Sequence, residues 1–267
     1  MIASFPMYDL AEIRSSTDAL WKAIAAAAHR PGEAAGEAVP SDLTRPTGRL
    51  LEHWLRPDIL LSQSCGYPVA RSFTPHQHVL GSFDVSSAEP GAPGWYRSVI
   101  VCRSNDDRRG RDLRDFDGCI AAVNDPDSLS GWVSLGWALA EHDAAARSVV
   151  YSASHAESLQ VVRNGMADIA SIDAHTLALL NAHRPTAVEG IHIVSRGPLV
   201  ALTPLFTAIG GLVDVLREAI GNAIEDLSAW DRATLQISGW VPHGDEAHRD
   251  VLALAQRARL ALPIPKE

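Results

Sequence analysis

Three loops rich in small polar residues carry the side chains that could do chemistry in this chain. They are residues 61–67 (LSQSCGY), 124–131 (NDPDSLSG) and 151–157 (YSASHAE). The second and third loops each precede a predicted helix. The first backbone N–H groups of a helix have no intrahelical partner, and they carry the positive end of the helix dipole. These loops are therefore the places where a negatively charged ligand would be held.

Serine hydroxyls add donors to those amides. Ser128, Ser130 and the amides near Gly131 form a candidate cradle for an oxyanion. The alternative is plain helix capping, because Ser and Asp are the favoured N-cap residues in any protein. The sequence leaves both interpretations open.

A histidine and an aspartate stand at the next two helix starts. Ser154 with Glu157 fits a capping box, which gives Ser154 a structural role and leaves His155 as the exposed member. A histidine at a helix N-terminus can donate to an anion, and the anion favours its charged form. Asp173 stands where a further helix begins, and it is either an N-cap or a ligand contact.

Motifs for covalent or metal chemistry are absent from the sequence. It contains no G-x-S-x-G, H-E-x-x-H, P-loop or G-x-G-x-x-G pattern. His76-Gln77-His78 has no third metal ligand nearby. A triad of Ser64, His155 and Asp173 is compatible with the sequence, but no feature of it favours one. We therefore predict no catalytic residue, no metal and no cofactor.

Composition excludes several classes of protein. The chain has 267 residues, 46% hydrophobic and 21% charged, which is ordinary globular usage and not that of a disordered chain. A formal net charge of -9 argues against a nucleic-acid partner. Three cysteines without a C-x-x-C pair are predicted to be buried free thiols.

Neither a signal peptide nor membrane insertion is predicted. The first residues carry no basic region, and Asp9, Glu12 and Arg14 interrupt any apolar run. The longest uncharged run, residues 197–213, is short for a membrane span and contains two prolines.

Short apolar strands alternate with helices along most of the chain. This alternation predicts an α/β fold with parallel sheets covered by helices, in which ligands bind beyond the carboxyl ends of the strands. The charged stretch 104–117 is predicted to be a solvated loop with a short helix. The predicted strands are 2–5, 59–63, 79–83, 95–103, 119–123, 148–152, 168–172 and 191–195, and the predicted helices are 9–28, 129–140, 154–164 and 174–182, with mostly helix after Thr207.

Taken together, these loops resemble one known family. The chain is similar to substrate-binding proteins of phosphate, phosphite and phosphonate ABC transporters, which have the type II periplasmic-binding-protein fold. The resemblance runs from about Ser4 to Pro204, and its more specific part is a Ser-x-Ser-Gly that opens one helix followed by a Ser-His that opens the next. The matching stretches are "ILLSQSCGY" (59–67), "WYRSVIV" (95–101), "NDPDSLSG" (124–131) and "SHAESLQVVRNGMADIASID" (154–173).

The resemblance implies a two-lobed α/β protein with its ligand cleft between lobes joined by two crossover strands, here 96–103 and 191–195. Lobe one would be residues 1–98 together with 195–267, which return to it and include the C-terminal helices, and lobe two would be residues 99–194. The implied partners are a small anionic or polar ligand and an ABC transporter permease. The implied ligand-binding residues are Ser128, Ser130 and His155, with Asp173 facing the ligand, an aromatic wall of Tyr8 and Tyr67, and Gln63 and Ser64 by position.

Two departures from the family pattern bear on the ligand. Members that bind aminoalkyl phosphonates hold the amine with carboxylates, and the matching positions here are His175 and Thr203. The resemblance therefore implies a small oxyanion, such as phosphate, phosphite or a simple phosphonate, or a different polar molecule. The family is periplasmic, whereas the sequence predicts no signal peptide, so a cytoplasmic location stays open. Two alternatives on the same fold therefore also stay open. One is a cytoplasmic sensor, and the other is an enzyme that uses His155 or Asp173 as a general acid or base on a small metabolite.

Overall fold

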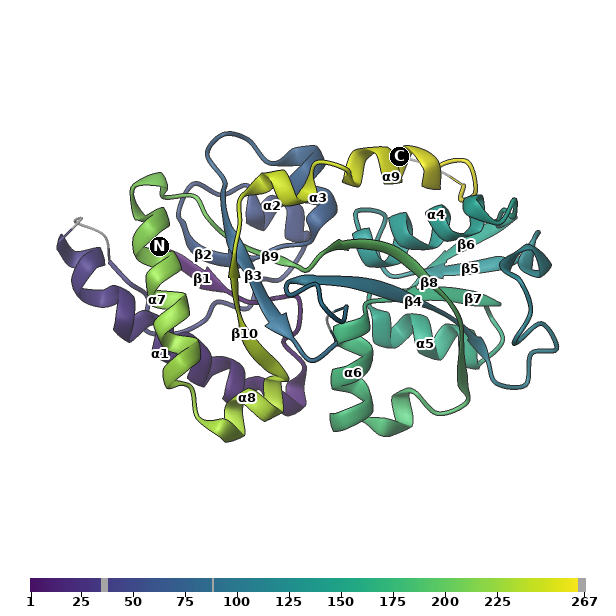
Figure 1. Ribbon diagram of the computed structural model, residues 1–267, viewed down its shortest axis with the longest axis horizontal. Coiled ribbons are helices and arrows are strands. Elements are labelled where there is room, and N and C mark those ends of the chain that lie inside the picture. The colour runs from purple at the N-terminus through teal and green to yellow at the C-terminus, as the bar shows by residue number, and fades with distance from the viewer. Residues whose placement is uncertain (35–37, 88, 264–267) are drawn as a thin grey trace. The chain divides into compact units, whose positions relative to one another are not determined.

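The computed structural model describes residues 1–34, 38–87 and 89–263. They form two compact units, each with its own five-stranded sheet (Figure 1). The first unit comprises Met1–Trp95 and Ala201–Arg249, and the second comprises Tyr96–Val200 and the residues from Asp250 onward. The predicted division differs from this one mainly in the C-terminal segment, which was expected in the first lobe. That segment packs on the second unit because its helix contacts α4 (Ser134–Glu141).

The first unit has a mixed sheet of order β1-β2-β9-β3-β10. Strands β1 and β2 are parallel, whereas β9 runs antiparallel to both β2 and β3, and β10 runs antiparallel to β3. The strands of the first unit are β1 (Ile2–Ser4), β2 (Ile59–Gln63), β3 (His78–Val85), β9 (Pro204–Thr207) and β10 (Ile237–Pro242), and its helices are α1 (Arg14–Ala34), α2 (Leu50–Trp54), α3 (Gly66–Ser72), α7 (Val213–Asp226) and α8 (Ala229–Leu235).

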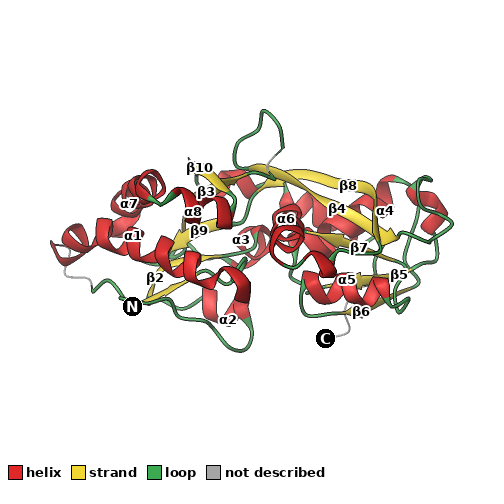
Figure 2. Ribbon diagram, turned by 90° about the horizontal axis from the view of Figure 1, so that it is seen from below, coloured by secondary structure: helices red, strands yellow, loops and turns green. Residues whose placement is uncertain are grey.

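The second unit has the strand order β6-β5-β7-β4-β8. Its neighbouring strands β6, β5 and β7 are parallel, and β4 runs antiparallel to β7. Figure 2 shows the long strands β4 and β8 running alongside each other. The strands of this unit are β4 (Trp95–Arg103), β5 (Ile120–Val123), β6 (Ser148–Tyr151), β7 (Ile169–Ile172) and β8 (Ile191–Ala201), and its helices are a π-helical turn (Leu129–Val133) that continues into α4, then α5 (His155–Arg163), α6 (Ala174–His183) and α9 (Val251–Ala258).

The prediction of an α/β fold is confirmed, but that of purely parallel sheets is wrong. Strand β10 lies after Thr207, where mostly helix was predicted, and β9 lies just before that region, where no element was predicted. Four-residue β9 is too short to show a period of two, and β10 carries Gly239 and Pro242, which blur its pattern. Helix α1 also begins later than predicted and continues through the Pro31-Gly32 pair that was expected to end it.

The charged stretch 104–117 is only partly a solvated loop. It contains the predicted short helix, a 3-10 turn at Leu113–Phe116. Asp106, however, is buried, and its carboxylate receives two hydrogen bonds from Arg108, at 2.9 Å from Nε and 2.7 Å from Nη2. Arg108 also bonds Asp168, whose other oxygen accepts from the backbone N–H of Ile120 at the start of β5. This ion-pair network therefore ties the loop to the amino ends of β5 and β7.

Two further predictions concern buried thiols and membrane spans. Cys65, Cys102 and Cys119 are buried thiols outside any disulfide, as predicted. Burial raises the pKa of Cys102 to about 11 and that of Cys119 to about 12, so neither is a thiolate near neutral pH. Over residues 1–34, 38–87 and 89–263, no helix has the length and apolar character needed to cross a membrane.

The C-terminal helix α9 packs closely on α4, beside which it lies in Figure 1. A Cβ atom at Gly136 would stand 2.7 Å from both the Cβ and the carbonyl oxygen of Ala258. Because the carbonyl belongs to a helix backbone, it cannot move aside cheaply. The packing is reinforced by Arg257, which bonds Glu141 at 3.0 Å and the carbonyl of Ala140 at 3.0 Å.

We expect Gly136→Ala to lower the free energy of unfolding of the second unit by about 1–3 kcal/mol through overpacking. Gly221→Ala is the matched control. This glycine also lies inside a helix, α7, but a Cβ there meets nothing described closer than Trp240 Cδ1 at 3.8 Å. The control variant should gain about 0.5–1 kcal/mol of helix propensity. Urea unfolding measures both changes, and the same sign in the two variants would contradict the packing argument.

Candidate functional site

Three helix starts of the second unit lie at one edge of its sheet. Strands β6, β5 and β7 are adjacent and parallel, so their carboxyl ends meet at the same edge. Each strand is followed directly by a polar loop and a helix N-terminus, namely those of the α4 segment, α5 and α6. This edge gathers three of the positive dipole ends at which the sequence predicted anion contacts.

The serine cradle forms at the start of the α4 segment. Ser128 caps it, and its Oγ accepts from the N–H of Gly131 at 2.9 Å. The Oγ of Ser130 lies 3.4 Å from that of Ser128, and both residues are buried. Capping and ligand binding are therefore compatible at Ser128, because its Oγ accepts in the cap and keeps its own proton to donate.

Asn124 lies beside this cradle, and the sequence analysis did not single it out. Its Oδ1 would lie 1.8 Å from a Cβ at Gly131, so this position accepts only glycine while Asn124 keeps its place. Within the described part of the chain, that buried Oδ1 has no hydrogen-bond partner. Sequence patterns could not reveal this role, because an Asn at the end of a strand is usually a turn residue.

His155 joins the second helix start to the first. Its Nε2 lies 2.8 Å from the Oγ of Ser130. The prediction that His155 is the exposed member of a capping box is wrong, because the side chain is half-buried against Ser130, whereas Ser154 caps α5 by accepting from the N–H of Glu157, as predicted. Burial lowers the pKa of His155, and nearby Asp173 and the backbone of Ser171 oppose that shift. The ring is therefore neutral near pH 7.

Asp173 caps the third helix start. Its Oδ1 accepts from the N–H of Thr176 at 2.8 Å, and the residue is 3% exposed. The N-cap interpretation is thus confirmed, while a ligand contact stays a prediction. Ser171, another residue that the sequence did not mark, donates from Oγ to the carbonyl of Ser130 at 2.6 Å and ties β7 to the cradle. Four of the eight predicted site residues, Ser128, Ser130, His155 and Asp173, are gathered at this edge.

The other four predicted residues belong to the first unit. Gln63 ends β2, and its Nε2 donates to Thr203 Oγ1 at 3.1 Å. Ser64 is fully buried and donates from Oγ to the carbonyl of Cys65 at 3.2 Å. The hydroxyl that pairs with His155 is that of Ser130, so the suggested triad with Ser64 gains no support.

The two predicted wall tyrosines lie after neighbouring parallel strands, β1 and β2. Tyr67 is buried in α3, with the guanidinium of Arg71 5.5 Å from its ring centroid. Tyr8 is half-buried in the turn that follows β1. Its neighbour Asp9 is held by Arg45, at 2.7 Å from Nε, and by Arg14 at 3.3 Å.

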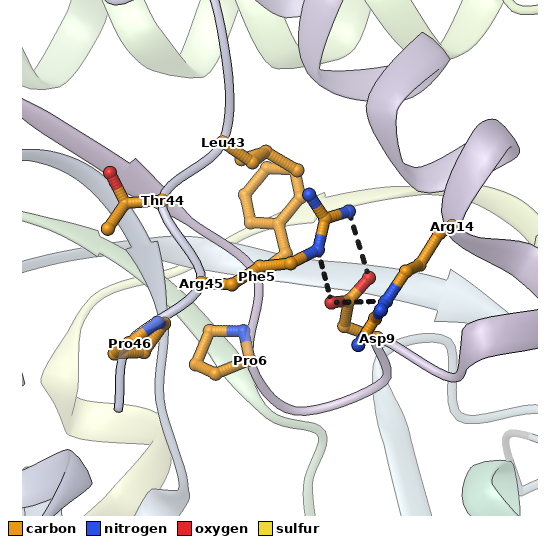
Figure 3. Close-up of a pocket in the computed structure, with 8 residues that line it drawn as sticks. All are labelled: Phe5, Pro6, Asp9, Arg14, Leu43, Thr44, Arg45 and Pro46. Carbon is orange, nitrogen blue, oxygen red and sulfur yellow. Dashed lines mark hydrogen bonds and ion pairs between the residues drawn. The ribbon is translucent and has the colours of Figure 1, made fainter. Parts of the chain in front are cut away.

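Figure 3 shows the guanidinium groups of both arginines pointing at this carboxylate from the wall of a small pocket of about 170 Å³. The segment that carries Arg45 is also pinned to β1 by a 2.7 Å bond from the N–H of Thr44 to the carbonyl of Ala3. The turn that presents Tyr8 is therefore held from two sides.

Metal binding gains no support from the geometry. His76 is exposed, and no cluster of three or more His, Cys, Asp or Glu side chains suited to a metal occurs within residues 1–34, 38–87 and 89–263. The arrangement at the edge of β6, β5 and β7 is instead rich in hydrogen-bond donors. Two hydroxyls, a histidine and three helix N-termini are suited to a small oxyanion.

Comparisons with known proteins match most of the chain to one family model. Residues 58–254 match the family model of the periplasmic substrate-binding protein of phosphonate ABC transporters. A search of curated proteins finds no match.

Solved structures with the same fold cover nearly the whole chain. PhnD1 from Prochlorococcus marinus, in complex with methylphosphonate, has a TM-score of 0.72 at 11% identity, covering 96% of this chain and 97% of that one. A binding protein of a phosphonate ABC transporter from Pseudomonas aeruginosa has a TM-score of 0.68 at 16% identity, with 97% and 87% covered. A chloride-bound protein from Xanthomonas citri has a TM-score of 0.70 at 12% identity, with 97% of both chains covered. At these identities the likeness shows the fold.

Proposed function

The chain belongs to the family of periplasmic substrate-binding proteins of phosphonate ABC transporters, and from this premise we propose that it binds a small phosphorus oxyanion. Candidate ligands are phosphate, phosphite and a simple phosphonate such as methylphosphonate, the ligand named for the Prochlorococcus protein. The family consists of transport proteins rather than enzymes. We propose that this chain likewise binds without breaking a bond and delivers its ligand to an ABC transporter permease from the periplasm.

One observation carries the proposal. The Oγ of Ser130 lies within hydrogen-bond distance of both Ser128 Oγ and His155 Nε2 at the edge where three helices begin. An oxyanion accepts hydrogen bonds and repels other acceptors, so a cluster of donors beside positive dipole ends favours it over cations. Bonds to a charged ligand are worth about 1.5–3 kcal/mol each.

We propose that the ligand carries no amine. The two positions that match the amine-binding carboxylates of the family are His175 and Thr203. His175 is 2% exposed on α6, and Thr203 is 6% exposed and already accepts a hydrogen bond from Gln63. Neither offers a negative charge to an ammonium group, which supports a ligand without an amine.

We expect Ser130→Ala to weaken methylphosphonate binding about 10- to 100-fold while leaving the fold intact, because one hydroxyl donor to the anion is lost. Isothermal titration calorimetry measures the change. Ser128→Ala should weaken binding and also lower stability, because it removes a cap worth about 1 kcal/mol. The matched control is Ser228→Ala, which removes the corresponding cap of α8 in the first unit, where Ser228 accepts from the N–H of Asp231.

Ser228→Ala should lower stability and leave affinity unchanged. If Ser130→Ala binds methylphosphonate with wild-type affinity, the serine cradle is not where the ligand binds. No binding of phosphate, phosphite or methylphosphonate to the wild type, with binding of an organic metabolite instead, would overturn the proposed ligand class.

A further inference from the structure

The hydrogen bonds around His155 leave one ring nitrogen unused. Its Nε2 pairs with the Oγ of Ser130 at 2.8 Å. Its Nδ1 is enclosed, and among the residues that the structure describes it has no hydrogen-bond partner. A neutral imidazole carries a single N–H, so one nitrogen of this ring is unsatisfied in either tautomer.

A bound oxyanion decides which way the Ser130–His155 bond runs. Ser130 has one hydroxyl proton, which it can give either to His155 Nε2 or to the anion. The anion can only accept, so in the complex Ser130 donates to it and accepts from Nε2–H. The proton on Nε2 is therefore fixed by the ligand, and Nδ1 is left as a bare lone pair unless a second proton binds there.

The charged groups around the ring come from few elements. Strands β5 and β7 and the turn Pro185–Ala187 pack against α5 and carry no ionisable side chain of their own. Asp173, which follows β7, is the carboxylate that acts on the ring, together with the backbone of Ser171. Asp125 after β5 is exposed, and Arg184 before the turn is half-exposed; neither contributes to the shift at His155.

Burial alone keeps the free ring neutral, since it is the largest cause of the lowered pKa. A bound anion adds a second negative charge beside the ring and opposes that effect. Asp173 already acts on the ring in the same direction as the bound anion would.

Resting on the proposed function, we propose that oxyanion binding at Ser130 is coupled to the uptake of one proton by His155. The proton comes from solvent and binds Nδ1. The resulting imidazolium donates from Nε2–H to Ser130 Oγ, and Ser130 donates its hydroxyl proton to the anion. The site then holds the anion and a cation together, and it discriminates against neutral ligands of the same shape.

Proton uptake is measured by titrating methylphosphonate into the full chain at pH 7.5 in buffers that differ in ionisation enthalpy. We compare the wild type with His155→Gln, whose amide can still donate to Ser130 but does not titrate. The wild type should take up about 0.5–1 proton more than this variant. Its affinity should fall, relative to the variant, by up to about tenfold for each unit of rising pH. Proton release or uptake by the ligand itself cancels in the comparison.

His142→Gln is the control, because His142 lies in the same unit, is partly exposed and bonds Asp112 at 2.9 Å. It should show the wild-type proton uptake. Nitrogen-15 spectra of the imidazole provide a second readout, with both ring nitrogens of His155 protonated in the complex and one in the free protein.

Equal proton uptake by the wild type and His155→Gln, with methylphosphonate still bound, would overturn the coupling and leave the proposed function standing. A bound-state spectrum of a neutral ring would do the same. Absence of binding by methylphosphonate, phosphite and phosphate to the wild type would overturn both proposals together.

Discussion

Replacing His248 with Leu is expected to remove most of the acid sensitivity of the first unit. His248 is 1% exposed, and over the described residues neither of its ring nitrogens has a hydrogen-bond partner. Its ring lies edge-on to that of His243, with 5.7 Å between the centroids. Burial, and secondarily the neighbouring His243, lower the pKa of His248 to about 3.

The direction of the pH effect follows from that shift. Between pH 6.5, the ordinary value, and about 3, the unfolded chain binds a proton at His248 that the folded chain excludes. Unfolding is therefore favoured as the pH falls through this window, by about 1.4 kcal/mol per pH unit and on the order of 5 kcal/mol in all. Above pH 6.5 the group is neutral in both states and contributes no pH dependence.

Hydrogen exchange at pH values from 7 to 4 measures the prediction, because it reports on the first unit separately from the second. His248→Leu should flatten the fall in stability of the first unit and raise its stability at pH 7 by about 1–3 kcal/mol, since an unsatisfied buried polar group is removed. His248→Phe serves as a second variant in case Leu packs poorly.

His76→Gln is the control, because it removes an exposed histidine from the same unit. It should keep the wild-type profile. An unchanged acid profile in both His248 variants would show that His248 accepts a proton in the folded chain without penalty.

The second large effect is expected from Asp106→Asn, which should lower the free energy of unfolding of the second unit by about 2–4 kcal/mol at pH 7. Its two hydrogen bonds from Arg108 are the main reason why the pKa of Asp106 is lowered to about 2. The variant would replace the carboxylate with a neutral amide that offers the guanidinium one acceptor oxygen instead of two, so the anchor of the loop 104–112 is weakened.

Asp106 also makes the folded chain sensitive to acid, but for a different reason from His248: acid removes a stabilising negative charge instead of forcing a proton onto a buried neutral ring. The depressed pKa of Asp106 stabilises the folded chain at every pH above its ordinary value of 3.8, and this stabilisation, about 2 kcal/mol, is lost as the pH falls through about 2. Urea unfolding of the wild type and Asp106→Asn should therefore differ most above pH 4 and converge below pH 2.

Asp58→Asn is the matched control. Arg56 bonds Asp58 in nearly the same two-fold geometry, at 2.9 and 2.8 Å, but both side chains are exposed. Water already solvates these charges, so the loss should be much smaller than at Asp106. Equal losses at the two positions would show that burial adds nothing to the Asp106 pair.

The sequence determined the local features of this protein. Ser128, Ser154 and Asp173 were identified as helix starts because capping depends on a side chain and an N–H only two or three residues away. The family also followed from short motifs, because the loops that hold an anion are continuous pieces of chain. Most of the order of strands and helices up to residue 201 was predictable for the same reason, but the short helices α2 and α3 were missed.

Only the tertiary structure decided which of these features meet. The 2.8 Å bond between Ser130 and His155 spans 25 residues, and it depends on β5 and β6 being parallel neighbours. The burial of Asp106 and the unpartnered nitrogens of His248 were equally invisible, because a charged or polar residue looks the same in sequence whether water or protein surrounds it. Short strands such as β9 exist because β2 and β3 supply their hydrogen bonds, and sequence periodicity carries no record of partners that lie more than a hundred residues away.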